Sequence, residues 1–363
     1  MNGSLQTYFE LPGHEQERAQ LPILAELIDR YRQETPFHGQ TVVFGHVLAR
    51  NSLVMVEAMV AGGAEVVLSD AHDAPGARQV RADLAQLSIP VLPVDQAVQQ
   101  AGLYLDVAAV LARAKAPLAA AEVTRTGVLH YLTVDVPVVS ADDARSKLIE
   151  GFYGTGESFL RAWQLLRPED PLPGKRLVTF GYGKIGRGVA FRARAGGLAV
   201  TVFDRDDGAR ARARGDGFAA LAPGQTEAVE LALERADIVI AVTGVAGAVG
   251  SSVPVEWLRQ GAVLVNLGAD DEYGPAFGDD EVLGGKIPPL NFHLPQPTLN
   301  RYVDAPLSAH LLALEHLVKQ RASLPAGVHP LPAALDRWVI ERWRMHQPTE
   351  DLTGIGPDLG LSA

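Results

Sequence analysis

The stretch RLVTFGYGKIGRGVAFRARAGGLAVTVFDRD, residues 176–206, decides the fold class of this chain. An apolar run leads into the glycine-rich segment 181–186, and a helical pattern follows it. Gly196 and Gly197 end that pattern before a second apolar run, which closes at Asp204. Strand, helix and strand in this order predict two parallel strands covered by a helix.

The glycine segment GYGKIG has the spacing G-x-G-x-x-G, and its context makes it informative. Gly181 permits a tight turn, Gly183 lets the backbone approach a diphosphate, and Gly186 lets the helix pack on the strand. Lys184 and Ile185 begin the helix, whose amino terminus favours phosphate. The segment therefore predicts a dinucleotide site, and the alternative is a structural turn that binds no nucleotide.

Asp204 ends the second strand, where a carboxylate accepts hydrogen bonds from both ribose hydroxyls of the adenosine. A 2′-phosphate would be repelled there, so Asp204 favours NAD over NADP. Arg205 leaves this point open, because an arginine here stacks on adenine or accepts a 2′-phosphate.

The rest of the chain repeats the alternation of strands and helices. TVVFGHV (41–47) and AEVVLSD (64–70) are typical of buried strands in the first half, and ADIVIAVTG (236–244) and GAVLVNLG (261–268) in the second. We therefore expect an α/β protein with two doubly wound parallel-sheet domains, one of them a Rossmann domain.

Composition excludes several classes of protein. The net charge is −11, which argues against nucleic acid or an anionic membrane surface as partner. The chain has no cysteine, which rules out disulfides and thiolate chemistry. No signal-like start and no apolar run of membrane-spanning length are visible, so we expect a soluble cytoplasmic protein with a small-molecule substrate.

Several motifs together resemble the S-adenosylhomocysteine hydrolase family. They are FYGTGES (152–158), GYGKIGRGVA (181–190) and LPAGVHPLPAALDRWV (324–339), with VEAMVAGGAEVVLSD (56–70) and EVTRTGV (122–128) nearer the start. The resemblance implies tightly held NAD, a homo-oligomer (dimer or tetramer) and a Rossmann domain inserted into a discontinuous substrate domain. It implies residues 1–157 plus 300–346 for the substrate domain and 158–299 for the NAD domain, and residues 347–363 are expected to be a loose tail.

The resemblance is weakest where the family grips and converts its substrate. Positions at which the family has polar or acid–base residues carry other residues here: Val47, Ala49, Asn51, Val107, Val123, Ser146, Glu150, Gly151 and Ala269. The chain is thus expected to be a divergent member in which most substrate-site residues are replaced. Positions near the family's cofactor are better matched: Thr124, Arg125, Thr126, Thr243, Gly244, Leu267, Gly268 and Asn291.

Four residues are candidates for acid–base chemistry. Glu150 occupies the position of a family aspartate near the nicotinamide, and an interdomain ion pair is its structural alternative. Lys147 could act as a base only if its ammonium group were removed from water. The alternative is that Lys147 is an ordinary solvated lysine with no catalytic role. His46 follows the first strand, where such sheets bind ligands, and His293 lies in a proline-bracketed loop near the expected nicotinamide. Both histidines have equally good structural explanations.

Other polar groups are weaker candidates. The acidic runs 270–272 and 279–281 resemble a metal cage, but adjacent loop carboxylates are usually solvated and we expect no metal. Arg301 and Tyr302 are expected on a loop, where they would bind an anion or close a hinge.

Three functions follow from these features. The first is an NAD-dependent oxidoreductase that oxidises or reduces a small hydroxylated or amino metabolite, with NAD either released or recycled in an internal redox cycle. The second is a divergent S-adenosylhomocysteine hydrolase. The third is an inactive NAD-binding regulatory protein.

Overall fold

The computed structural model describes residues 2–72 and 75–361, and the chain divides into two compact units. The first unit consists of Met1–Ile149 and Asn300–Asp351, and the second of Glu150–Leu299 and Leu352–Ala363. This division falls earlier than the position expected after residue 157. The reason is a π-helical turn, η1 (Glu150–Gly154), whose backbone packs on the second unit: a Cβ at Gly188 would lie 2.0 Å from the Phe152 carbonyl oxygen.

A seven-stranded parallel sheet forms the centre of the first unit, as far as the chain is described. Its order is β12-β6-β5-β4-β1-β2-β3. The strands are β1 (Thr41–Gly45), β2 (Glu65–Ser69), β3 (Val91–Leu92), β4 (Leu103–Asp106), β5 (Ala119–Glu122), β6 (Pro137–Ser140) and β12 (Gly327–Pro330). Because the chain proceeds from β1 in one direction and then returns to β4 on the other side, the strand order reverses between β1 and β4.

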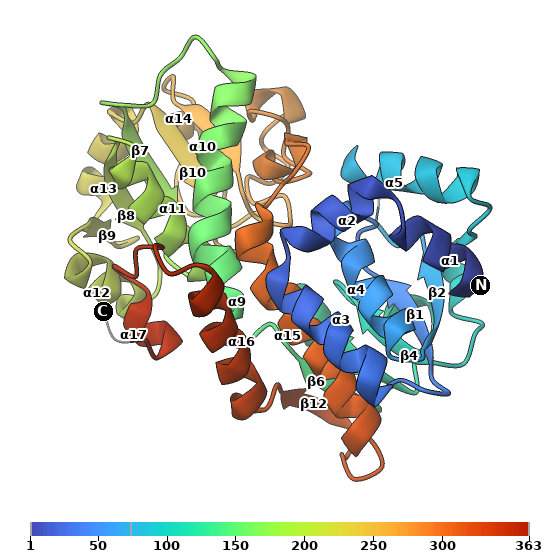
Figure 1. Ribbon diagram of the computed structural model, residues 1–363. Coiled ribbons are helices and arrows are strands. Elements are labelled where there is room, and N and C mark those ends of the chain that lie inside the picture. Colours follow the sequence, from blue (N-terminus) through green and yellow to red (C-terminus); the bar gives the residue numbers. More distant parts are fainter. Residues whose placement is uncertain (1, 73–74, 362–363) are drawn as a thin grey trace. The chain divides into compact units, whose positions relative to one another are not determined.

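Helices from both ends of the chain belong to this unit. They are α1 (Asn2–Phe9), α2 (Pro12–Ala19), α3 (Pro22–Glu34), α4 (Arg50–Ala61), α5 (Pro75–Gln86), α6 (Val94–Ala97), α7 (Val110–Ala114), α8 (Arg125–Tyr131), α9 (Lys147–Ile149), α15 (Asn300–Gln320) and α16 (Ala333–His346). Figure 1 shows α3 and α15 side by side, and α15 also packs on β5 and β6. The carboxylate of Asp304 on α15 accepts hydrogen bonds from the backbone N–H groups of Ile23 and Leu24, at 2.8 and 3.1 Å. These bonds satisfy donors that the first turn of α3 leaves without helical partners.

The second unit is built on a parallel sheet of order β11-β10-β7-β8-β9. Its strands are β7 (Arg176–Phe180), β8 (Ala199–Phe203), β9 (Ala219–Leu221), β10 (Ile238–Ala241) and β11 (Val263–Asn266). Its helices are α10 (Thr155–Leu166), α11 (Lys184–Ala195), α12 (Asp207–Gly215), α13 (Thr226–Glu234), α14 (Val255–Leu258) and α17 (Gly356–Leu359), with the 3₁₀ turns η2 (Asp279–Glu281) and η3 (Leu290–His293). The expected α/β class with two parallel sheets is confirmed.

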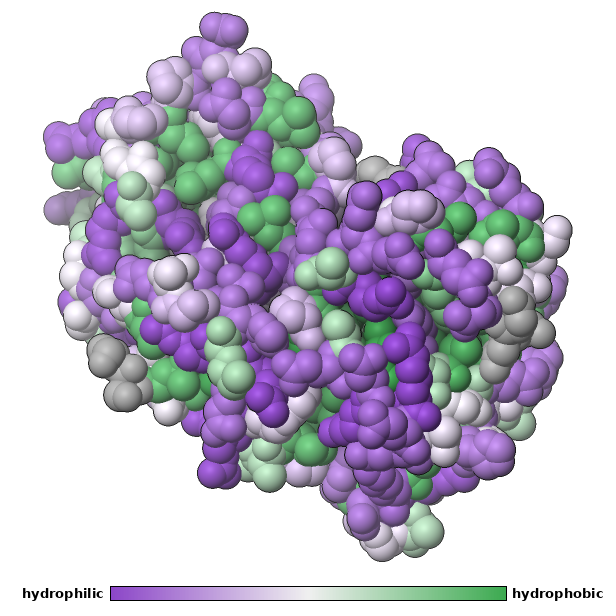
Figure 2. All heavy atoms as spheres, viewed as in Figure 1, coloured by the Kyte–Doolittle hydropathy of each residue, from purple (hydrophilic) through white to green (hydrophobic). Residues whose placement is uncertain are grey.

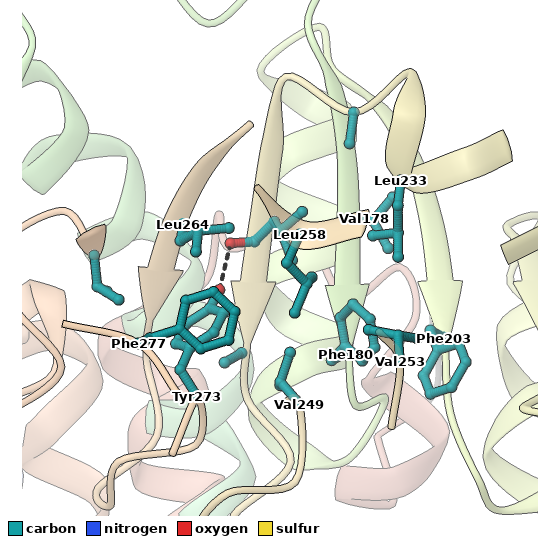
Figure 3. Packing of buried hydrophobic residues seen from close by; sticks show 14 of the residues in the cluster. Val178, Phe180, Phe203, Leu233, Val249, Val253, Leu258, Leu264, Tyr273 and Phe277 are labelled. Carbon is teal, nitrogen blue, oxygen red and sulfur yellow. Dashed lines mark hydrogen bonds between the residues drawn. The ribbon is translucent and has the colours of Figure 1, made fainter. Parts of the chain in front are cut away.

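A tyrosine fixes two strands of the second sheet together. Figure 3 shows Tyr273 and Phe277 packed in the apolar cluster that also contains Val249, Leu258 and Leu264. The Tyr273 hydroxyl donates to the carbonyl oxygen of Val239 on β10 at 2.9 Å and accepts from the Val265 N–H of β11 at 3.2 Å. The ring is fully buried, so its one polar atom is satisfied by backbone groups.

The expectation of a loose tail is wrong for residues 352–361. Ile355 and Leu359 are buried, and Asp358 accepts a hydrogen bond at 2.5 Å from Arg187 on α11. Gly354 has a φ of +80°, and a Cβ there would meet the ring of Phe191. The segment packs because its spaced apolar side chains find a matching surface on α11.

The face of the molecule drawn in Figure 2 is mixed in polarity. Figure 2 shows hydrophilic side chains over much of the face in view, with hydrophobic ones scattered among them. Among the helices that the structure describes, none has both the length and the apolar character needed to cross a bilayer.

Candidate functional site

A cavity of about 350 Å³ lies at the carboxyl ends of β7, β8 and β10. The strand order of the second sheet reverses between β7 and β10, and doubly wound sheets bind ligands outside such a reversal. Its lining includes Gly181, Gly183, Asp204, Arg205 and Thr243. Five of the residues predicted to bind cofactor are therefore brought together around one cavity.

The three motif glycines have distinct geometric roles. Gly181 has a φ of +106°, and a Cβ there would lie 2.5 Å from the Val242 carbonyl oxygen. A Cβ on Gly186 would lie 2.1 Å from the Gly181 carbonyl oxygen, so both positions are restricted by neighbouring backbone. A Cβ on Gly183 would meet no atom within 4 Å, which leaves open space beside an exposed backbone.

The open space lies where α11 begins. Gly183 is the N-cap residue of this helix, and no side chain caps it. The first N–H groups of a helix carry partial positive charge and suit phosphate oxygens. The absence of a Cβ at Gly183 and of a capping side chain thus fits the diphosphate of a dinucleotide.

Asp204 connects the glycine turn to the next loop. Its Oδ2 accepts a hydrogen bond from the Tyr182 N–H at 2.7 Å, and its Oδ1 accepts from the Asp206 N–H at 2.8 Å. Each carboxylate oxygen has a second lone pair for a ribose hydroxyl. Arg205 also lines the cavity, and its guanidinium donates to the Ser252 hydroxyl at 2.8 Å.

Glu272 shapes the wall formed by Thr243 and Gly244. Its carboxylate accepts from the Thr243 N–H and hydroxyl at 2.6 and 2.8 Å and from the Gly244 N–H at 2.7 Å. Burial raises the pKa of Glu272. A Cβ on Gly268 would lie 2.0 Å from this carboxylate. Gly268 therefore leaves room for the acid that holds the loop.

The remaining acidic groups are also occupied by protein partners. Asp271 pairs with Lys286 at 2.8 Å, and Glu281 with Arg259 at 2.6 Å. Within the described ranges, no cluster of histidine, aspartate and glutamate has the arrangement of a metal site. The acidic runs thus have structural contacts that account for them.

The other predicted cofactor residues of this unit differ in their burial. Ile185 and Leu267 pack in one apolar cluster of the unit. Lys184 is exposed at the start of α11. Asn291 is buried in η3, and its side-chain N–H donates to the Pro297 carbonyl at 3.5 Å. His293, a candidate base, has Nε2 2.8 Å from the Gly284 carbonyl oxygen, which occupies that nitrogen with a structural bond.

The first unit has its own strand-order reversal, between β1 and β4, and histidines gather there. His46 directly follows β1, and His72 lies three residues beyond β2. The imidazole of His72 donates from Nε2 to the Val107 carbonyl oxygen, just beyond β4, at 3.2 Å. Imidazole side chains therefore lie at the carboxyl edge of the first sheet, whereas glycines of the turn after β7 lie at the corresponding edge of the second sheet.

A third histidine comes from the far end of the chain. His310 on α15 lies with its ring centroid 6.0 Å from that of His46. Burial holds the pKa of His46 well below its usual range, and the nearby His310 and His72 act in the same direction. Burial also lowers the pKa of His310 to about 4, with Lys147 adding to the effect. Two predicted candidates, His46 and Lys147, are thus brought into one electrostatic cluster.

Two buried carboxylates hold the loop after β4. Asp106 accepts from the N–H groups of Leu111 and Ala112 and from the Tyr131 hydroxyl. Glu122 accepts from the N–H of Ala109 at 2.9 Å and from the Thr124 hydroxyl at 2.7 Å. These carboxylates lie one residue before Val107 and Val123, and their oxygens are committed to the protein.

The three residues predicted at the nicotinamide end lie at the start of α8. Thr124 is the N-cap, and its hydroxyl accepts from the Gly127 N–H at 3.2 Å. The Thr126 hydroxyl lies 3.5 Å from that of Thr124. Arg125 is exposed and 4.0 Å from Asp143. Their assignment to the cofactor stays a prediction.

Three further predicted residues, Glu150, Arg301 and Tyr302, are placed as follows. Glu150, half-buried, is the first residue of η1, and π-helical turns are frequent at functional sites. Arg301 and Tyr302 were expected on a loop and lie instead in the first turn of α15, since the helix begins at Asn300. The Tyr302 hydroxyl donates to Glu350 at 3.0 Å, and the Arg301 guanidinium lies over the Tyr302 ring.

Sequence reasoning missed His310 and His72. The signal for His310 is a histidine in the apolar segment LSAHLLAL (307–314), where the helix is buried on nearly all sides. A buried helix has little use for an imidazole without a partner. His72 follows the second strand by three residues, which is a weaker signal.

Comparisons with known proteins agree with the dinucleotide cavity. Residues 151–273 match the family described as S-adenosyl-L-homocysteine hydrolase, NAD binding domain. An S-inosyl-L-homocysteine hydrolase of Methanopyrus kandleri is 27% identical, with 89% of this chain and 87% of the relative aligned. An adenosylhomocysteinase of Nostoc sp. is 27% identical over 88% and 85%, and one of Thermoplasma acidophilum is 26% identical over 89% and 90%. These relatives are enzymes by name, and the matched domain includes the glycine turn and Asp204. Residues 151–273 therefore match the NAD binding domain of S-adenosyl-L-homocysteine hydrolases, the chain is similar to such hydrolases over nearly nine-tenths of its length, and its dinucleotide is NAD.

Proposed function

We propose that this protein is an NAD-dependent oxidoreductase that acts on a small hydroxylated or amino metabolite. The observation that carries the proposal is the contrast between the two sheet edges. The NAD cavity is complete, whereas the first unit has valine at positions 47, 107 and 123, where the resemblance expects a histidine and two carboxylates. A substrate recognised by those polar groups would lose its contacts here.

NAD supplies the two-electron oxidation or reduction of a carbon that bears oxygen or nitrogen. The chain must then accept or return the proton of the substrate's hydroxyl or amino group. A neutral imidazole does this near pH 7, and burial keeps the pKa of His46 low enough for the neutral form. We assign this role first to His46, with Lys147, Glu150 and His293 as the other proposed groups.

A second candidate function is hydrolysis of an S-nucleosyl-homocysteine, in which NAD would be recycled within each turnover. The relatives favour it, because proteins named S-inosyl-L-homocysteine hydrolase and adenosylhomocysteinase align with nearly nine-tenths of this chain. It requires that several replaced positions be dispensable. On this candidate, His46 would still be the nearest group for proton transfer at the first sheet edge.

Both candidates are tested with the NAD-loaded protein and two readouts. A panel of hydroxy acids, polyols, nucleosides and amino acids is followed at 340 nm for net NADH. S-adenosyl- and S-inosyl-homocysteine are followed for free homocysteine. Net NADH from a panel member, with no homocysteine, supports the oxidoreductase. Rapid homocysteine release without net NADH overturns it in favour of the hydrolase.

A further inference from the structure

His310 is a buried imidazole with no visible use. Its side chain is inaccessible to solvent, and within the described part of the chain neither ring nitrogen makes a hydrogen bond of ordinary geometry, although the backbone of Ala121 acts on the ring as a weak partner. Leaving a buried polar group without a hydrogen bond is costly, so such groups normally have a water, a ligand or a functional reason. The helix around it, from Tyr302 to Leu314, is otherwise a continuous buried surface.

The nearest aromatic neighbour of His310 has the same deficit. Nδ1 of His46 is buried and makes no hydrogen bond among the described residues. The two ring centroids are 6.0 Å apart and the ring planes are inclined by 44°. No direct hydrogen bond joins the rings. One oxygen atom between them, with bonds of about 2.8 Å to each, would satisfy a nitrogen on both sides.

The surroundings keep this pair neutral. The titratable neighbours that act on His46 are His310, His72 and Lys147, each of which disfavours the protonated imidazole, whereas a backbone hydrogen bond with Val47 favours it. Lys147 acts in the same direction on His310. A neutral imidazole has one donor and one acceptor nitrogen, which suits a hydroxyl or water rather than an anion. Neither ring retains a proton near pH 7, so a proton that enters the pair is held only transiently, as in a relay.

The location connects the pair with a ligand. His46 lies at the reversal of strand order between β1 and β4, where a doubly wound sheet leaves its crevice. Its ring is partly exposed while Nδ1 is fully buried, so the accessible edge is the one that carries Nε2. The buried edge faces inward, on the side where a partner is missing.

We propose that His310 is a proton-relay and positioning residue for His46, joined to it by one bridging oxygen. This rests on the proposed function. His46 Nε2 takes the proton of the substrate's O–H, and His46 Nδ1 gives its own proton to the bridging water. That water passes a proton to His310. The O–H bond breaks as its proton leaves, and NAD, when bound, would supply the acceptor for the two electrons of the adjacent C–H bond.

The first test needs no substrate. Protein with NAD bound and with ¹⁵N-labelled histidine is compared by NMR with His310→Gln, His310→Phe and a control, His316→Gln, a half-buried position on the same helix. We expect the His46 Nδ1 resonance to show a hydrogen bond that is lost in His310→Phe and kept in the control. An unchanged His46 resonance in folded His310→Phe overturns the relay, whatever the protein's substrate.

The second test uses whichever panel compound or homocysteine thioether the protein converts. We expect His310→Gln to lower kcat about 100-fold, within the usual range for acid–base groups, with KM and NAD affinity nearly unchanged. Glutamine can hold a bridging oxygen but cannot take a proton, so a purely structural role predicts wild-type kcat for His310→Gln. That result overturns the relay and leaves the proposed function intact.

Chemical rescue separates the two roles further. In His310→Ala, added imidazole restores a relay partner, and we expect kcat to rise with its concentration. The gain is expected to vary with the pKa of substituted imidazoles, as proton transfer does. A gain that is independent of their pKa indicates cavity filling and overturns the relay.

Discussion

The two parallel sheets end in edges that differ in what they offer a ligand. At the edge of β7 and β8, Gly183 leaves open space and exposed backbone, and the cavity there is lined largely by turns. At the edge of β1 and β4, a Cβ on Gly45 would lie 2.6 Å from Leu111 and 2.8 Å from Asp106, so that glycine serves packing. The same topology thus supports a backbone-built phosphate site in one unit and a side-chain-built acid–base cluster in the other.

The largest expected effect comes from closing the open space at Gly183. We expect Gly183→Val to weaken NAD binding about 1,000-fold, or about 4 kcal/mol, because the side chain occupies the place of the diphosphate. Thermal stability should change little, since a Cβ there meets no neighbour. Calorimetric titration with NAD measures the affinity. Gly224→Ala, another position with open space, is the control, and equal affinities in both variants would refute the site.

The second prediction concerns pH and the side-chain edge. Folding lowers the pKa of His310 from 6.5 to about 4, so the unfolded chain binds its proton more tightly. This contribution to stability is present above pH 6.5 and is lost as the pH falls towards 4. We expect it to amount to about 3 kcal/mol. Urea unfolding of wild type and His310→Gln at several pH values should show a shallower acid dependence in the variant. Parallel curves would contradict the burial of a neutral imidazole.

The variant Gly45→Ala tests the other sheet edge, that of β1 and β4, where we infer that the glycine serves packing rather than NAD binding. The added methyl group collides with Leu111 and Asp106, and overpacking of this kind costs about 1–3 kcal/mol. NAD affinity should stay as in wild type. Hydrogen exchange of β1 and β4, together with an NAD titration, separates the two effects. A loss of NAD binding without loss of stability would show that the two glycines have equivalent roles.

The smallest expected effect is on cofactor selectivity. Asp204→Asn removes the charge that repels a 2′-phosphate, and Arg205 lies on the same cavity wall. We expect the preference for NAD over NADP to fall about tenfold, or about 1.4 kcal/mol. Titrations with both dinucleotides measure it. Asp207→Asn, whose carboxylate is 94% exposed and does not line the cavity, is the control and should leave the ratio unchanged.

Local patterns predicted the second sheet edge well because its elements are consecutive. Gly181, Gly183 and Gly186 lie within one turn and its helix, and Asp204 follows the next strand. The spacing of these residues along the chain therefore determines how they are arranged in space. The prediction of a loose tail failed because the sequence does not show that Leu352, Ile355 and Leu359 are buried. Their burial depends on packing against α11. Arg301 and Tyr302 belong to α15, which begins at Asn300 and continues through Pro306.

The sequence by itself determined the α/β class, the parallel pairing around residues 176–206 and the NAD cradle, because strand–turn–helix geometry depends on neighbours in the chain. Only the tertiary structure decided that His310 lies beside His46. It also decided that the carboxylates of Asp106 and Glu122 accept hydrogen bonds from the backbone of the loop after β4. Those contacts join residues from distant parts of the chain, and their burial, which sets both pKa values and hydrogen-bond partners, exists only after the sheet has formed.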